Sequence, residues 1–352
     1  MLAPSEYEAS EARGYLDTGT YGLPPRSSVE AVERALAGWR GRAPWRRWED
    51  DGEACRALFA GLVGASPEDV ALLPAASVAA GLVAASLAAG RGDNVVLCED
   101  DFTSTLLPWR GLERSGVDLR LTPLDELASA VDARTRLVAV SSVQSADGAR
   151  ADVDALRATG VPLFVDATQA VGAVPVAVDG IAYLAAHPYK WLLAPRGLAF
   201  LYVRRDLLAA IEPWTAGWKS RASPYETYYG IPELTPDARR LDVSLPWLVA
   251  AGARPSLELL AELGAERVAE HDLALARRFA AGLGLPEPAS PIVRVRIEDA
   301  AAAVERLRAA GIACSVRAGS VRFCFHLYND EADVDLALEA LEPAVAGQAG
   351  HL

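Results

Sequence analysis

The chain has 352 residues, a formal net charge of −13 at pH 7 and 51% hydrophobic residues. A chain of this length and composition can bury a full core, and we expect one large and one smaller domain. Its acidic balance argues against nucleic acid or an anionic membrane as the main partner, because both bind clusters of basic residues.

Targeting and metal signals are absent from the sequence. The first fourteen residues carry three acidic side chains, and no stretch reaches eighteen uninterrupted apolar residues. We therefore expect a cytoplasmic protein without a signal peptide or membrane span. Four cysteines form no C-x-x-C pair and four histidines show no ligand spacing, so we expect neither disulfides nor a metal. The arginine- and tryptophan-rich run 39–48 precedes three acidic residues, which favours a solvated or subunit-facing segment.

Short β-rich runs alternate with Ala/Leu-rich stretches between about residues 60 and 205. This pattern is typical of βαβ units and predicts an α/β fold with a mostly parallel sheet. The expected strands are 70–73, 94–98, 117–121, 137–142, 162–165 and 198–203, and the helical stretches include 77–89 and 153–158. Ligands of such sheets bind beyond the carboxyl ends of the strands, so the residues there are candidates for function.

The pattern weakens between residues 213 and 246, where aromatic residues, glycine and proline indicate a long ordered excursion with interdomain and intersubunit contacts. A helical stretch over 255–281 follows, and the remaining elements are strand 292–297, helix 299–310, strands 313–317 and 321–325, and helix 331–344. We predict an N-terminal arm (1–30), a large domain (31–245) and a small α+β domain (246–352, with part of the arm).

The two lysines, Lys190 and Lys219, stand out among 34 basic residues. Arginine stays protonated, whereas a lysine with a lowered pKa can form an imine. Lys190 lies among aromatic and aliphatic residues in the run 187–197, and such surroundings lower the pKa of an amine.

Two other segments carry groups that suit the same chemistry. Asp166 ends the apolar run 163–166, although it could equally cap a following helix. Ser77 opens a helical stretch after a strand, where free backbone N–H groups can bind phosphate, although it could be an ordinary N-cap. A phosphate cradle, a strand-terminal carboxylate and a desolvated lysine are together the parts that pyridoxal phosphate (PLP) requires.

These segments resemble the class V aminotransferase family of fold-type I PLP enzymes, whose relatives include kynureninases, cysteine desulfurases and isopenicillin-N-epimerase-like proteins. The resemblance extends from 15–25 to 325–330 and is most specific at 166–170 (DATQA) and 189–192 (YKWL). It implies PLP as cofactor, a large domain with a mostly parallel seven-stranded sheet, a smaller α+β C-terminal domain, and a homodimer with the active site at the subunit interface.

The resemblance also assigns roles to single residues. Asp166 would pair with the pyridinium nitrogen, Gln169 would bond the ring 3-oxygen, and Lys190 would form the internal aldimine and move the Cα proton. The phosphate would bind a set of backbone and side-chain groups from Ala76, Ser77, Val78, His187, Tyr189 and, across the dimer interface, Ser244. Two positions keep an alternative: Phe102 or Thr103 would stack on the ring, and Gln144 or Ser145 would approach the 3-oxygen.

Two arginines are candidates for substrate binding. Arg322 matches the arginine that binds the substrate α-carboxylate in this family. Alternatively, Arg322 could be an ordinary strand residue that faces solvent. Arg317 is a second candidate for substrate binding. His326 could be a hydrogen-bonded structural histidine or a substrate contact. Only four residues separate the arginines, where cysteine desulfurases insert the loop with their nucleophilic cysteine. Desulfurase chemistry is therefore disfavoured.

The residues named so far are common to several reactions of an α-amino acid through an external aldimine. We favour transamination, with C–S or C–C lyase chemistry (β-elimination or kynureninase-like cleavage) or epimerisation as alternatives. A non-catalytic PLP-fold protein is disfavoured by intact Asp166, Gln169 and Lys190. A nicotinamide dehydrogenase is disfavoured because no G-x-G-x-x-G follows a strand.

Overall fold

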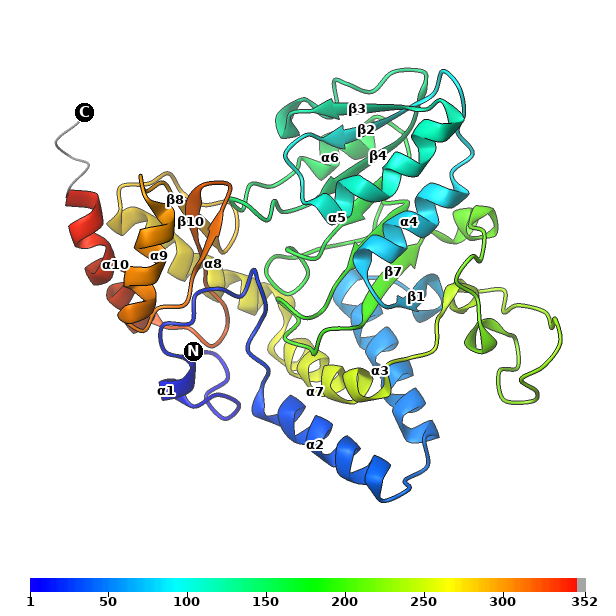
Figure 1. Ribbon diagram of the computed structural model, residues 1–352, viewed down its shortest axis with the longest axis horizontal. Helices are drawn as coiled ribbons and strands as arrows, with labels where there is room; N and C mark the ends of the chain where they lie inside the picture. Colours follow the sequence, from blue (N-terminus) through cyan, green and yellow to red (C-terminus); the bar gives the residue numbers. More distant parts are fainter. Residues whose placement is uncertain (347–352) are drawn as a thin grey trace.

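The computed structural model describes residues 1–346, and a seven-stranded sheet forms its larger part (Figure 1). The strands are β1 (Val70–Leu73), β2 (Asn94–Cys98), β3 (Asp118–Thr122), β4 (Thr135–Ser141), β5 (Leu163–Asp166), β6 (Tyr183–Ala186) and β7 (Ala199–Val203). Their order is β1-β7-β6-β5-β4-β2-β3, and β7 alone runs in the direction opposite to the other six strands. The predicted mostly parallel sheet is confirmed. The six expected strands are present, and β6 adds a strand that was not among them.

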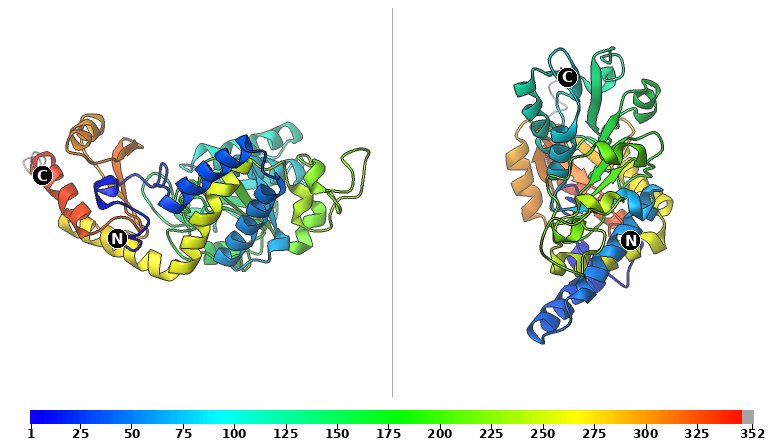
Figure 2. Two further views of the ribbon diagram at one scale, coloured as in Figure 1. Left: turned by 90° about the horizontal axis from the view of Figure 1, so that it is seen from below. Right: turned by 90° about the vertical axis from the view of Figure 1, so that its right-hand side faces the viewer.

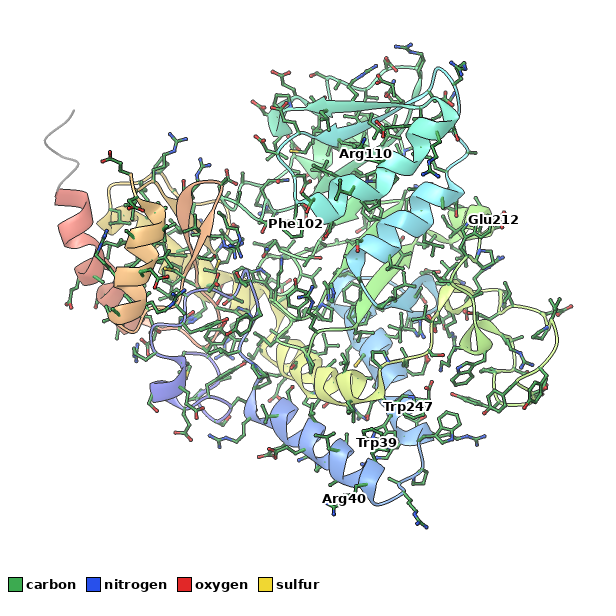
Figure 3. All side chains as sticks on the ribbon, viewed as in Figure 1. Trp39, Arg40, Phe102, Arg110, Glu212 and Trp247 are labelled. Carbon is green, nitrogen blue, oxygen red and sulfur yellow. The ribbon has the colours of Figure 1, made fainter. Side chains whose placement is uncertain are left out.

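Helices cover both faces of this sheet because the side chains of each strand alternate between two cores. Val70 and Leu72 of β1 face one core with α3 (Arg46–Val63) and α7 (Trp247–Leu263), whereas Ala71 and Leu73 face the other core with α4 (Ala76–Ser86). The expected helix 153–158 is α6 (Val153–Ala158). The arginine- and tryptophan-rich run 39–48 spans the end of α2 (Arg26–Arg40), the connection and the start of α3. Figure 3 shows Trp39 and Arg40 at the end of α2.

The single helical stretch expected over 255–281 is wrong. The structure has two helices, α7 and α8 (Ala265–Gly282), which are separated by Gly264 at φ +83°. Glycine adopts this conformation readily, so the chain can turn there. α7 packs on the large sheet, and α8 continues to the smaller part of the molecule (Figure 2).

The smaller part is built on a three-stranded antiparallel sheet of order β8-β10-β9. Its elements are β8 (Ile292–Val295), α9 (Ala300–Ala309), β9 (Ser315–Arg317), β10 (Ser320–Cys324) and α10 (Glu331–Ala346), which confirm the expected α+β pattern. The N-terminal arm lies against this sheet, since Asp17 bridges Cys324. The last six residues of the predicted small domain lie outside the described residues.

The segment 213–246 forms the predicted excursion, with only short helical turns at Trp218–Ser220 and Ala238–Leu241 (Figure 1). It exposes large apolar side chains, including Trp214 at 71% and Tyr229 at 84%. Within residues 1–346, every helix is too short or too polar to cross a bilayer.

Candidate active site

Two adjoining cavities lie at the carboxyl ends of β4 and β5, and Lys190 belongs to the wall that they share. The smaller, about 160 Å³, is lined by groups from the large part of the chain, among them Ala76, Ser77, Asp166, Thr168, Gln169 and His187. The larger, about 630 Å³, is bordered by the N-terminal arm (19–24), the loop after Lys190, and Arg317. Most of the sequence candidates therefore meet at one place, whereas Val78, Gln144, Ser244 and Arg322 lie outside both linings.

Lys190 sits on a tightly held turn after β6. Its side chain is 5% exposed, and its Nζ lies 5.5 Å from the centroid of the Phe102 ring. Gly22 N–H donates to the Tyr189 carbonyl at 2.9 Å, and a Cβ at Gly22 would lie 2.1 Å from the Lys190 carbonyl oxygen. Burial lowers the pKa of Lys190 to about 8, against an opposing effect of the Asp166 carboxylate. The lowered pKa expected for an imine-forming amine is thus present.

Asp166 ends β5 and is 7% exposed. Its carboxylate accepts hydrogen bonds from Thr168 N at 2.9 Å and Thr105 Oγ1 at 3.2 Å. No regular helix follows within the next ten residues, so the side chain caps a turn rather than a helix. Asp166 also lines the smaller cavity, so its carboxylate is available to a ligand there.

Another part of the smaller cavity's lining suits an anion. Ala76 and Ser77 begin α4 and line the cavity, so the helix directs free N–H groups into it. Val78 is not among the lining residues, and its N–H donates to Ala75 O at 3.1 Å. His187 contacts the Tyr189 ring edge-on, with ring centroids 4.5 Å apart. Burial and two nearby cations lower the pKa of His187 to about 4, and within residues 1–346 its Nδ1 is buried without a partner.

The structure also separates the paired alternatives. Phe102, labelled in Figure 3, lines both cavities. Thr103 lies at the start of α5 (Thr103–Leu106) and is in neither lining. Ser145 likewise borders both cavities, while Gln144 borders a different hollow and donates to Ser141 O at 3.2 Å.

Gln169 is held on both sides by hydrogen bonds. Its Nε2 donates to Gly19 O and Ser145 Oγ, both at 3.0 Å, and its Oε1 accepts from Trp191 Nε1 at 2.7 Å. At 4% exposure it forms a fixed part of the smaller cavity's wall.

The two candidate substrate arginines converge on one hydroxyl. Arg322 and Arg317 each donate to Thr20 Oγ1 at 2.8 Å, and Arg322 also donates to Ser145 O at 2.7 Å and Asp17 at 3.2 Å. Arg322 is fully buried, so its solvent-facing alternative is wrong. Arg317 lines the larger cavity, and burial together with the neighbouring Arg322 charge lowers its pKa.

Ser244 does not join this group within one chain. Its Oγ accepts from Trp218 Nε1 at 2.8 Å in the excursion, outside the lining of both cavities. In contrast, Arg196 was not a candidate, yet it lines both cavities and lies 5.1 Å from the Tyr189 ring centroid. Its position six residues after Lys190, in the same loop, is the signal that could have identified it.

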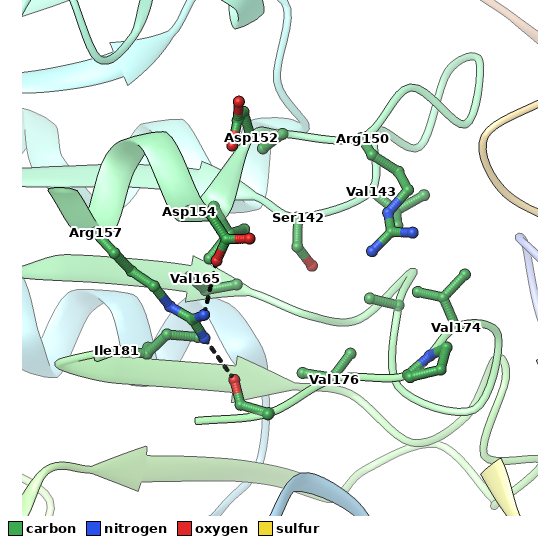
Figure 4. Close-up of a pocket in the computed structure, with 15 residues that line it drawn as sticks. Ser142, Val143, Arg150, Asp152, Asp154, Arg157, Val165, Val174, Val176 and Ile181 are labelled. Carbon is green, nitrogen blue, oxygen red and sulfur yellow. Dashed lines mark hydrogen bonds and ion pairs between the residues drawn. The ribbon is translucent and has the colours of Figure 1, made fainter. Parts of the chain in front are cut away.

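A further cavity of about 310 Å³ lies beside α6 (Figure 4), and Lys190 is not among its lining residues. Arg157 in its wall is already engaged, donating to Asp154 at 2.9 Å and to Ala177 O at 3.2 Å. We assign the chemistry to the Lys190 cavities because the groups suited to catalysis converge there.

Comparison with known proteins agrees with this geometry, since the family model for aminotransferase class V matches residues 45–337. The chain belongs to the class V aminotransferase family. It is 30% identical to an uncharacterized aminotransferase of Bacillus subtilis, over 84% of this chain and 85% of that protein. It is 28% identical to isopenicillin N epimerase of Streptomyces clavuligerus, over 99% and 100% of the two chains. The apo structure of a cysteine desulfurase from Thermococcus onnurineus has the same fold, with a TM-score of 0.85, 23% identity and 98% of each chain covered.

The cofactor of a class V aminotransferase is PLP, and the residues present fit it. The smaller cavity offers an amine with a lowered pKa, a carboxylate with room beside it, free N–H groups at the start of α4 and an unpartnered His187 nitrogen. Lys190 would hold the cofactor covalently, Asp166 would pair with its ring nitrogen, and Ser77 and His187 would lie at its phosphate. The protein is therefore a PLP-dependent enzyme of this family.

Proposed function

We propose that the chain is an aminotransferase that acts on α-amino acids. The observation that bears on this choice argues against one alternative, the desulfurase. The turn between β9 and β10 consists of Ala318 and Gly319, both at positive φ, and brings no cysteine to Lys190. The four cysteines are all buried, and none lines either cavity. A desulfurase nucleophile therefore has no counterpart among residues 1–346, and the aminotransferase relative of Bacillus subtilis supports the same reading.

PLP supplies an electron sink for negative charge that develops at the substrate Cα. The chain's own groups direct the proton at that carbon. The buried Lys190 amine, once free, can remove and return the proton, and its lowered pKa keeps part of it unprotonated near neutral pH. Asp166 would pair with the cofactor's ring nitrogen and favour its protonated form.

A carboxylate-bearing substrate suits the charges of the larger cavity. Its charged lining side chains within the described chain, Lys190, Arg196 and Arg317, are all cationic, although the protein is strongly acidic overall. Arg317 and Arg322 share the Thr20 hydroxyl, and among the described residues Asp17 is the one carboxylate within ion-pair distance of either guanidinium. A substrate α-carboxylate would balance the remaining positive charge and replace Thr20 or Ser145 as acceptor.

The substitution Arg322→Lys tests this binding mode. We expect kcat/KM for amino acids to fall at least about tenfold, because a lysine ammonium cannot serve Ser145, Thr20 and a carboxylate in fork geometry. The corresponding decarboxylated amines should be less affected. Arg294 pairs with Arg322 on the neighbouring strand, so Arg294→Lys is the matched control. It should change kcat/KM neither for amino acids nor for the decarboxylated amines. Equal losses for acids and amines would contradict the assignment.

The reaction is decided by incubating the holoenzyme with a panel of amino acids in the absence of any keto acid. We expect one equivalent of keto acid and the spectrum of pyridoxamine phosphate. A second candidate, lyase chemistry, is favoured by the probable cysteine desulfurase of Methanothermobacter thermautotrophicus, 27% identical over 82% of each chain. Repeated release of pyruvate, alanine or a thiol would establish it instead, and change of configuration at Cα would establish an epimerase.

We also propose that the enzyme is a homodimer in which Ser244 reaches the phosphate site of the partner subunit. The excursion that carries Ser244 exposes Trp214, Tyr228, Tyr229 and Ile231, an apolar group that a second copy would cover. Dilution to monomers should then weaken PLP binding, as measured by sedimentation together with cofactor titration. Ser244→Ala should weaken PLP binding and Ser223→Ala should not. A stable monomer that retains PLP would rule out this arrangement.

A further inference from the structure

A buried histidine–aspartate pair of the small part contacts the turn that carries Lys190. His326, two residues after β10, and Asp272 on α8 are both fully buried, and His326 Nδ1 lies 2.6 Å from Asp272 Oδ2. The other ring nitrogen, Nε2, lies 3.0 Å from the carbonyl oxygen of Trp191. A carbonyl can only accept, so Nε2 carries a proton, and a second proton lies between Nδ1 and the carboxylate. Of the two alternatives left by the sequence, the structure shows the hydrogen-bonded histidine.

Trp191 directly follows Lys190 and is fixed by two hydrogen bonds, one to its backbone and one from its side chain. His326 binds its backbone carbonyl, and Gln169 accepts from its indole N–H at 2.7 Å. The His326 and Trp191 rings also pack edge-on, with centroids 5.2 Å apart. His326 belongs to the small part and Gln169 to the loop after β5, so both parts of the molecule fix the same residue.

Stability alone gives no reason for this pair. Asp272 Oδ1 has no hydrogen-bond partner among the described residues, and burial raises the pKa of this carboxyl to about 6. Buried ion pairs are often matched or surpassed in stability by apolar residues of similar size, because desolvation offsets their attraction. What the pair adds is a directed hydrogen bond to the backbone beside Lys190.

We propose that Asp272 and His326 are positioning residues for Lys190: by fixing the Trp191 carbonyl, they set the direction in which the lysine amine points. The amine must reach both the cofactor site beside Asp166 and the substrate Cα, so its position affects the proton transfer more than substrate binding. This inference rests on the proposed role of Lys190 as the PLP-bearing lysine and adds that the small part sets its geometry.

The test compares two amides at position 326. In His326→Gln the amide nitrogen can take the place of Nε2 and donate to Trp191, whereas the shorter side chain of His326→Asn reaches only toward Asp272. We expect His326→Asn to lower two rates at least about tenfold: kcat, and the rate at which the apoenzyme binds PLP covalently. KM should change little. His326→Gln should recover most of both. His271→Leu is the matched control, since His271 adjoins Asp272 and binds the Asn329 carbonyl at 3.1 Å, away from Lys190.

Melting temperature and cofactor content are measured in parallel, and rates are expressed per bound PLP. Equal rates in His326→Asn, His326→Gln and the unaltered enzyme would overturn the inference, even if melting temperatures differ. Failure of the underlying function is distinguishable, because borohydride would then trap no PLP on Lys190 in the unaltered enzyme.

Discussion

Lys190→Ala is expected to lose the visible absorbance of lysine-bound PLP, and borohydride reduction should then leave no cofactor attached to the chain. Turnover should fall at least about a thousandfold, because the same amine carries the cofactor and moves the proton, and proton transfer alone contributes about 10²–10⁴-fold. The structure supports this because Lys190 is the lysine that lines both cavities. Absorbance spectra and mass spectrometry of the reduced protein are the measurements.

Lys219→Ala is the control for this loss, since it removes the chain's other lysine. Lys219 Nζ lies 2.5 Å from Glu49 Oε2, and both side chains are buried. Its removal leaves a buried carboxylate without its ion-pair partner, so the free energy of unfolding should fall by about 3 kcal/mol. The visible absorbance should remain. If Lys190→Ala instead kept the spectrum and Lys219→Ala lost it, the assignment of the cofactor lysine would be wrong.

The pKa of Lys190 also predicts how the apoenzyme takes up PLP. Only the unprotonated amine attacks an aldehyde, and burial lowers the pKa to about 8 from an ordinary value of 10.5. The rate of covalent binding should therefore rise with pH and level off above about 8. A rate that continues to rise towards pH 10 would show that the amine is not desolvated.

Asp166→Ala should keep bound PLP but lower turnover about a hundredfold or more, the usual cost of removing one charge-stabilising group. The residues at the phosphate and Lys190 would still hold the cofactor, whereas the ring nitrogen would lose the carboxylate proposed to keep it protonated. The measurements are kcat per bound PLP and cofactor content.

The control for Asp166 is Asp152, a carboxylate whose visible role is to cap α6. Asp152 Oδ1 accepts from Ala155 N at 2.9 Å. Asp152→Ala should cost about 1 kcal/mol of stability and leave kcat unchanged. Near-normal turnover in Asp166→Ala would reduce Asp166 to the same capping role.

The sequence by itself determined the fold class, and it named Lys190 and Asp166 as candidates, which the structure brings into one cavity. The strands β1, β2, β4 and β5 are short runs of mostly buried residues. Turn-forming and polar residues bound these runs in the sequence, so their positions were predictable. Lys190 and Asp166 were identifiable because each lies next to such a strand or turn, and because lysine is rare in this chain.

Tertiary structure decided which of the remaining side chains reach the cavities. Whether Gln144 or Ser145 faces inward depends on how the loop after β4 packs, because neighbouring residues point in opposite directions. The break at Gly264 depends on α7 and α8 packing against different sheets, which helical periodicity does not encode.

The longest-range contacts were the least predictable. Arg322 meets Asp17 across 305 positions, and His326 meets Trp191 across 135. No local pattern links residues so far apart, since their contact exists only after the large sheet, the small sheet and the N-terminal arm have packed together. The candidate lysine could therefore be named from the sequence, whereas the groups proposed to orient it required the folded chain.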